Sequence, residues 1–218
     1  MIRAVLFDFD GTVADTAKTI VETFRSTLSQ AGLKEHTEAE IRATIGLPLN
    51  TSFMILENQL SLEEANKLCA IYEEIYQETA FKKLEAYDGI REVLKDVRSR
   101  GLKAAVVSSK KTRIIEEMVQ ALDIAEYFDV LLGEDQVENK KPAPDMALKA
   151  LRLLGDIDPS EGLVLGDSTY DIRMGNTAGC HTVWASYGYG KGDDVLKENP
   201  DFIVEDPRGL AGILDRLS

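Results

Sequence analysis

Short apolar runs alternate with helical patterns along most of this 218-residue chain. They are partly β-branched and lack regular polar alternation, which is typical of strands buried on both faces of a parallel sheet. Four such runs and a fifth candidate are residues 2–7, 103–107, 130–132, 162–165 and 181–185. Apolar residues recur with helical spacing at 88–100, 112–122, 142–154 and 171–178. The alternation predicts an α/β fold with a parallel sheet and packed helices.

The segment from residue 16 to 81 departs from this alternation, because it contains no convincing strand pattern. Within it, Ile20, Phe24 and Leu28 recur at the spacing of one helix face. A helical insertion directly after the first strand predicts a cap over a site at that strand's end. We therefore expect hinges at 13–15 and 84–89, an α/β core of residues 1–15 and 83–218, and a helical cap of residues 16–82.

The chain carries a formal net charge of −13. This balance argues against nucleic acid, which binds clustered lysines and arginines, and against an anionic membrane surface. No apolar run approaches the ~20 residues of a membrane-spanning helix. The negative net charge is still compatible with a small phosphorylated substrate, because a few cations near the site can outweigh the field of distant acidic residues. The two cysteines form no CxxC pattern and no apolar leader begins the chain, so we expect a reducing cytoplasm.

The strongest chemical signal is the sequence Asp8-Phe9-Asp10-Gly11-Thr12, which follows the first apolar run. Two carboxylates so close together repel unless a cation relieves them, and Mg²⁺ prefers such oxygen ligands. A plain acidic turn is the alternative. A calcium loop is excluded, because its fifth and sixth positions here hold Thr12 and Val13 instead of an acid or amide and a glycine.

Three weaker signals follow later strands. Ser108 ends the run 103–107, and a hydroxyl there suits a phosphoryl oxygen. Lys141 precedes Pro142, which suits the first turn of a helix, where an anion settles. Asp167 follows the run 162–165, and Asp171 comes one helical turn later. Each signal also has an ordinary explanation: a serine that ends a strand, a solvated lysine, or an aspartate that caps a helix. However, each of them follows a predicted strand or begins a predicted helix, and this shared position favours one common site.

These residues resemble the motifs of the haloacid dehalogenase superfamily of phosphohydrolases. The resemblance implies a Rossmann-like core with the first strand central. It implies that Asp8 is the nucleophile and Asp10 the general acid and base. It also implies that Ser108 and Lys141 hold the phosphoryl group.

For the metal, the resemblance implies that Mg²⁺ is bound by Asp8, the main-chain carbonyl of Asp10, and Asp167. Asp171 would support this metal site without binding the ion directly. A carboxylate nucleophile divides phosphoryl transfer into two easier steps, and one group that acts first as an acid and then as a base suits such a double displacement.

Within the superfamily, the chain is similar to phosphoglycolate phosphatase-like enzymes and related pyrophosphatases. We expect hydrolysis of a small phosphorylated metabolite, with a phosphoglycolate-like monoester favoured and pyrophosphate as an alternative. A β-phosphoglucomutase-like mutase is disfavoured, because Ile20 and Leu49 stand where the resemblance to those mutases would require a histidine and an arginine. A non-catalytic phosphate- or partner-binding domain is a further, weaker alternative.

Specificity should depend on the cap loop of residues 45–50, whose glycine and proline indicate a shaped turn. A second substrate anion would need a cation from the cap. The candidates are Arg42, Lys67, Lys82 and Lys83, although surface solvation explains each of them better.

Overall fold

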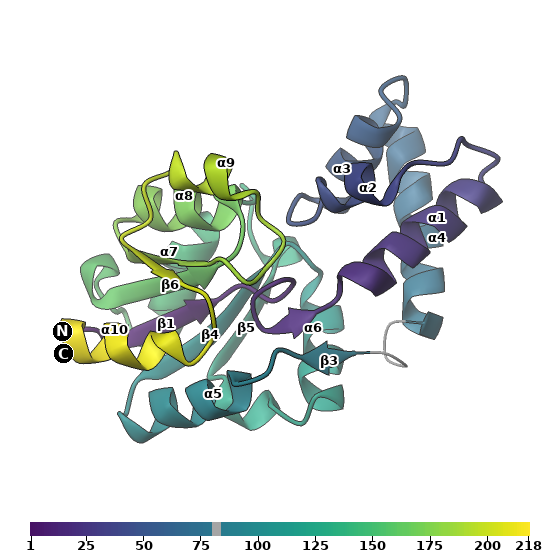
Figure 1. Cartoon of the computed structure of the whole chain (residues 1–218). Helices are drawn as coiled ribbons and strands as arrows, with labels where there is room; N and C mark the ends of the chain where they lie inside the picture. The colour runs from purple at the N-terminus through teal and green to yellow at the C-terminus, as the bar shows by residue number, and fades with distance from the viewer. Residues whose placement is uncertain (80–83) are drawn as a thin grey trace.

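A computed structural model describes residues 1–79 and 84–218 of the chain. Six parallel strands form one sheet in the order β5-β4-β1-β6-β7-β8 (Figure 1). Their bounds are β1 Ala4–Phe7, β4 Lys103–Ser108, β5 Val130–Gly133, β6 Gly162–Gly166, β7 His181–Ala185 and β8 Phe202–Val204. The predicted α/β fold is confirmed, with β1 between β4 and β6. The sequence patterns did not identify β8, an edge strand in which only Val204 is buried.

Helices cover both faces of the sheet because successive strand residues point to opposite sides. In β1, Val5 and Phe7 belong to one apolar cluster, and Ala4 and Leu6 belong to another. The first cluster is completed by α5 (Ile90–Ser99), α6 (Thr112–Ala121) and α10 (Gly209–Leu217). The second is completed by α7 (Asp145–Leu153) and α8 (Thr169–Ala178). The short helices are α9 (Gly192–Leu196), η2 (Ala125–Tyr127), η3 (Glu134–Gln136) and η4 (Pro159–Glu161).

Two helix starts differ from the sequence expectation. The helix predicted from residue 142 begins at Asp145, with Pro144 as its N-cap, and the Lys141–Pro142 peptide is cis. Helical geometry is disfavoured for a residue that precedes proline, and Pro144 follows Ala143. Lys141 therefore does not stand directly ahead of a helix. Conversely, α8 begins two residues earlier than predicted, because Ser168 caps it.

Within residues 16–79 of the insertion, every regular element is a helix, and loops connect the helices. The insertion consists of α1 (Ala17–Gln30), α2 (Glu38–Arg42), α3 (Leu49–Leu56) and α4 (Leu62–Thr79). These helices form a group of their own beside the sheet (Figure 1). Aromatic packing holds the group together, since the ring centroid of Phe24 lies 4.8 Å from Phe53 and 5.0 Å from Tyr72.

The two segments predicted to be hinges contain a two-stranded antiparallel sheet, in which β2 (Ala14–Asp15) pairs with β3 (Glu85–Ala86). Strands of two residues carry no recognisable pattern, so the sequence did not predict this pairing. The expected boundary at residues 82 and 83 lies outside the described residues, and the exact domain limits stay a prediction. None of the described helices has both the length and the apolar character needed to cross a membrane.

Candidate active site

Side chains from four strand ends meet at the carboxyl edge of the sheet. Asp8 directly follows β1, Ser108 ends β4, and Asp167 directly follows β6. Lys141 lies between β5 and α7, and Asp171 lies in the first turn of α8. All five are buried. Parallel strands place their carboxyl ends at one edge, where ligands of such sheets bind.

Lys141 is the centre of the hydrogen bonds in this group. Its Nζ donates to Asp8 Oδ1 at 2.6 Å, to Asp171 Oδ1 at 2.6 Å and to the main-chain oxygen of Val107 at 2.9 Å. Burial acts to lower the pKa of Lys141, but the two carboxylates outweigh it and hold that pKa above its ordinary value. The lysine is therefore a fixed positive charge beside Asp8.

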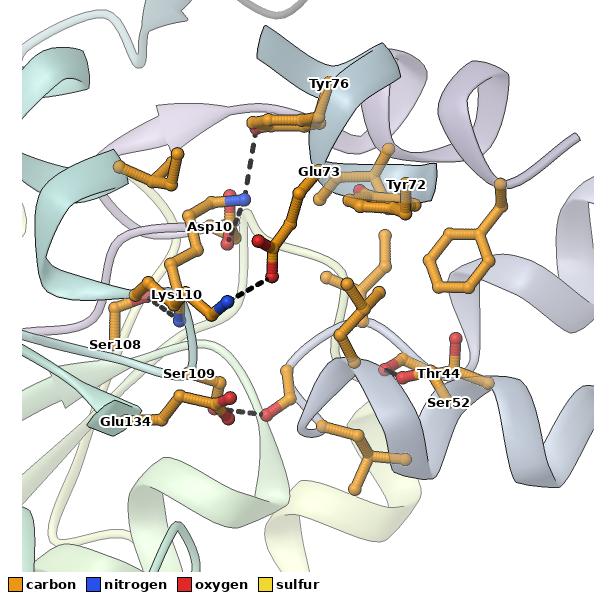
Figure 2. Close-up of a pocket in the computed structure, with 18 of the residues that line it drawn as sticks. Asp10, Thr44, Ser52, Tyr72, Glu73, Tyr76, Ser108, Ser109, Lys110 and Glu134 are labelled. Atoms are coloured by element: carbon orange, nitrogen blue, oxygen red, sulfur yellow. Dashed lines mark hydrogen bonds and ion pairs between the residues drawn. The ribbon is translucent and has the colours of Figure 1, made fainter. Parts of the chain in front are cut away.

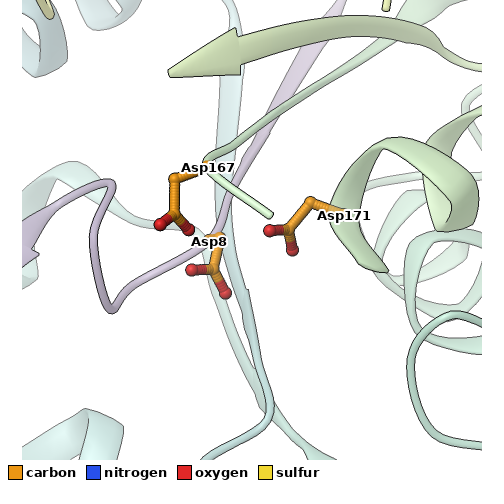
Figure 3. A group of neighbouring side chains, drawn as sticks. All are labelled: Asp8, Asp167 and Asp171. Carbon is orange, nitrogen blue, oxygen red and sulfur yellow. The ribbon is translucent and has the colours of Figure 1, made fainter. Parts of the chain in front are cut away.

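One lysine does not balance the acidic side chains around it. Carboxylate oxygens of Asp8, Asp167 and Asp171 lie within 4.8 Å of one another (Figure 3). Burial raises the pKa of Asp8 to about 7, with a further upward contribution from Asp171 and an opposing one from Lys141. Burial and the charge of Asp8 also raise the pKa of Asp167 well above its ordinary value. Such a site favours a further cation with a preference for oxygen.

The hydrogen bonds show which of these oxygens are open to a metal. Both oxygens of Asp171 are occupied, Oδ1 by Lys141 and Oδ2 by the Ser168 hydroxyl at 2.6 Å. Asp167 accepts from the main-chain N–H of Tyr189 through Oδ2 at 2.6 Å. Within the described part of the chain, no donor reaches Asp8 Oδ2 or Asp167 Oδ1. The donor set therefore fits Mg²⁺ on Asp8 and Asp167, with Asp171 in support.

Close packing against Asp167 explains the glycine of the first motif. Gly11 has φ +83°, and a Cβ added there would stand 2.4 Å from Asp167 Oδ2. The left-handed conformation and the missing side chain both make glycine necessary at this turn.

Asp10 lines the same pocket as Asp8 and contacts the start of the helical insertion and the segment after β4. Its Oδ1 accepts from the Thr16 hydroxyl at 2.5 Å, and its Oδ2 lies 3.1 Å from Lys110 Nζ. Lys110 also donates to the hydroxyl of Tyr76 on α4 at 3.1 Å (Figure 2). Lys110 was not among the site residues predicted from the sequence. Its position two residues after Ser108 is the signal that was available.

Two further contacts join the core to the helical insertion around this point. The Ser109 hydroxyl donates to the main-chain oxygen of Gly46 at 2.8 Å. Lys111 Nζ lies 2.6 Å from a Glu73 carboxylate oxygen on α4. Both contacts start from the segment that follows β4, so the residues after Ser108 form the seam between core and insertion.

A pocket lies between the carboxyl edge of the sheet and the helical insertion (Figure 2). Asp8, Asp10 and Ser108 line its core side. From the predicted specificity loop of residues 45–50, Ile45, Gly46, Leu47 and Leu49 line it. Asn50 does not, and its side-chain amide instead donates to Asn66 at 3.4 Å.

The candidate cations of the insertion do not line this pocket where the structure describes them. Arg42 lies 2.8 Å from Glu38, and Lys67 lies 2.8 Å from Glu63, in each case one helical turn along the same helix. Lys82 and Lys83 lie outside the described residues. The interpretation as a surface charge fits Lys67, whereas Arg42 is half-buried, lies over the ring of Tyr189 and lines a second pocket together with Asp167.

The comparison with known families agrees with this geometry. The model of the haloacid dehalogenase-like hydrolase family matches residues 5–185, which include every residue of the site. The chain belongs to this family. Its hydrolase fold is also that of a haloacid dehalogenase-like hydrolase from Streptococcus pneumoniae, whose structure superposes with a TM-score of 0.86 at 24% identity and covers 98% of each chain.

Two relatives of this chain are named for an enzyme activity. A phosphoglycolate phosphatase from Aquifex aeolicus is 32% identical over 98% of this chain and 97% of its own length. A pyrophosphatase, PpaX, from Bacillus cereus is 30% identical over 100% of this chain and 98% of its own length. This haloacid dehalogenase-like hydrolase is thus similar along its whole length to phosphatases of two kinds.

Proposed function

We propose that this hydrolase is a magnesium-dependent phosphatase that acts on a small phosphorylated metabolite through an aspartyl-phosphate at Asp8. The observation that carries the proposal is the contact of Lys141 with Asp8, beside buried acids and at the base of a capped pocket. The free cysteines, Cys69 and Cys180, are compatible with the reducing cytoplasm that we propose as its compartment.

Asp8, Asp167 and the main-chain carbonyl of Asp10 would hold Mg²⁺. When bound, the ion neutralises these carboxylates and the phosphoryl oxygens. The protein would supply the rest of the positive charge, because Lys141 is held beside Asp8 and would face the same phosphoryl group. Ser108, at the end of β4, offers its hydroxyl to another phosphoryl oxygen.

In the proposed reaction, a carboxylate oxygen of Asp8 attacks phosphorus and the bond to the leaving oxygen breaks. Asp10 donates a proton to that oxygen. Asp10, now ionised, takes a proton from water, which attacks the aspartyl-phosphate and releases inorganic phosphate and free Asp8. The contacts of Lys110 and Thr16 with Asp10 hold its carboxyl group at the pocket, where the leaving group would lie.

The cap would close the site to bulk water. The Ser109–Gly46 hydrogen bond and the Lys111–Glu73 ion pair, which join the cap to the core, support this proposal. Exclusion of water strengthens the contacts of Lys141 with the phosphoryl oxygens. The β2–β3 pairing at the two hinges places any opening motion next to Asp10.

The test of this function is hydrolysis of p-nitrophenyl phosphate by the purified full chain. We expect turnover with Mg²⁺ and its loss in excess chelator, with recovery when Mg²⁺ is restored. Equal rates with and without the chelator would contradict the metal requirement. Absence of turnover with this ester, with alkyl phosphates and with pyrophosphate would contradict the phosphatase assignment.

The names of the relatives supply two substrates for this reaction. Phosphoglycolate, favoured by the resemblance of the sequence, is the first to test, and pyrophosphate is the second candidate because of the full-length similarity to PpaX. Both molecules carry a second anionic group beyond the phosphoryl group that is transferred.

Replacement of Lys141 by alanine is expected to lower kcat/KM by about 10²-fold or more, because it removes a fixed charge that faces the phosphoryl group. The size-matched Lys141→Met variant should show the same loss, which would assign it to charge. Steady-state kinetics with Mg²⁺, with circular dichroism as the control for folding, would measure this. Wild-type kinetics in either variant would make Lys141 a structural charge only.

A further inference from the structure

The pocket has a reactive end and a far end with different chemistry. Asp8, Asp10 and Ser108 form the reactive end. The far end lies within the cap and is lined mainly by apolar side chains, namely Ile20, Phe24, Ile45, Leu47 and Leu49, together with the phenol ring of Tyr72. A leaving group that is joined to a phosphoryl group at Asp8 would extend into this apolar region.

The two aliphatic hydroxyls at the far end are already engaged, and the remaining side-chain polar group there is the neutral phenol of Tyr72. The Thr44 hydroxyl donates to the main-chain oxygen of Ile41 at 2.8 Å. The Ser52 hydroxyl donates to the main-chain oxygen of Thr44 at 3.1 Å. Neither hydroxyl has its proton free for a carboxylate or phosphate. Of the described residues that line the pocket, none at the far end carries a positive charge.

The two lysines that line the pocket lie at its core side, and both are paired. Lys110 contacts Asp10 and Tyr76, and Lys111 contacts Glu73. A second anion on the substrate would have to displace one of these carboxylates. Displacement of Asp10 from Lys110 would also remove a contact that holds Asp10, the proposed general acid and base, in place.

A further carboxylate adds to the negative charge at the core side of the pocket. Glu134, in η3, lines the pocket, and its Oε1 accepts from Lys140 at 2.8 Å. Its Oε2 is buried, and no donor in the described residues reaches it. Burial raises the pKa of Glu134, which is the expected response to a poorly compensated charge. An anionic leaving group would be brought close to Glu134 and Glu73, and no described residue of the pocket offers it a free cation.

From this distribution we infer that the substrate is a phosphomonoester whose leaving group is uncharged and largely apolar. The inference rests on the proposed phosphatase function and specifies its substrate class. An unpaired anion in an apolar region loses its hydration without compensation, whereas alkyl groups gain from leaving water. Phosphoglycolate and pyrophosphate are then poor substrates of this chain, in contrast to the substrates in its relatives' names.

The test compares esters that differ only in charge or in apolar length. Isobutyl phosphate has the shape of phosphoglycolate, with two methyl groups in place of the carboxylate oxygens. With the full chain and Mg²⁺, we expect its kcat/KM to exceed that of phosphoglycolate by about 10²-fold or more. Along ethyl, propyl and butyl phosphate, kcat/KM should rise by about fourfold for each added methylene.

A second experiment introduces a cation at the far end of the pocket by substitution. Leu47→Lys places an ammonium group at the far end, and it should raise kcat/KM for phosphoglycolate while lowering it for isobutyl phosphate. Asn50→Lys is the matched control, because Asn50 belongs to the same loop but does not line the pocket. That variant should leave the ratio of the two kcat/KM values within about twofold of wild type, as is usual for surface changes of this kind.

The outcomes separate the inference from the function on which it rests. If phosphoglycolate or pyrophosphate is hydrolysed as efficiently as isobutyl phosphate, the inferred substrate class is wrong and the phosphatase function stands. If no ester is hydrolysed, including p-nitrophenyl phosphate, the proposed function fails and the inference fails with it. An equal response of the ratio to Leu47→Lys and Asn50→Lys would also overturn the inferred role of the far end.

Discussion

Asp8→Asn is expected to abolish phosphatase activity, with kcat lowered by at least about 10⁴-fold. The amide has the shape of the carboxylate but is not a nucleophile, so no aspartyl-phosphate forms. The wild-type enzyme should yield an acid-stable phosphoprotein when a labelled substrate is quenched during turnover. The variant should yield none, and this readout separates loss of the nucleophile from weaker substrate binding.

Folding is the control for this result. Because burial raises the pKa of Asp8 to about 7, its charge is costly in the metal-free protein, and asparagine removes that charge. We therefore expect the melting temperature of Asp8→Asn in chelator to equal or exceed that of the wild type. Full activity of the variant, or the same phosphoprotein yield as the wild type, would refute covalent catalysis at Asp8.

Asp10→Asn is expected to slow both halves of the reaction by about 10²–10⁴-fold, the usual contribution of general acid–base catalysis. The carboxyl group of Asp10 is held between Thr16 and Lys110, and asparagine keeps a similar shape without the transferable proton. Rapid-quench kinetics would measure formation and hydrolysis of the phosphoenzyme separately. The loss in the first step should be larger for an alkyl phosphate than for p-nitrophenyl phosphate, whose leaving group needs little protonation.

The same substitution at an exposed aspartate serves as the control for the loss of rate in Asp10→Asn. Asp156→Asn is suitable, because Asp156 is exposed and has φ +52°, a conformation that asparagine tolerates. That variant should keep wild-type kinetics. If Asp10→Asn hydrolyses alkyl phosphates at the wild-type rate, the acid–base role belongs to another group.

Much of the fold was accessible from local patterns. The strands β1 and β6 lie within a sheet covered on both faces, so their sequences are continuous apolar runs. Asp8 and Asp167 directly follow these runs, and parallel strands bring their carboxyl ends to one edge. That these two side chains meet therefore follows from the order of residues along the chain. The short strand β8 and the pairing of β2 with β3 could not be predicted, because two or three residues carry no periodicity.

Local pattern and strand direction were sufficient to establish the α/β class, the helical insertion and the set of acids, hydroxyl and lysine at the sheet edge. The charges that surround a substrate, in contrast, were decided only when the chain packed. Lys110 meets Asp10 across 100 positions of the chain, and Lys111 meets Glu73 on the cap. Pairings of this kind depend on which side chains face one another after packing, and no spacing in the sequence records them.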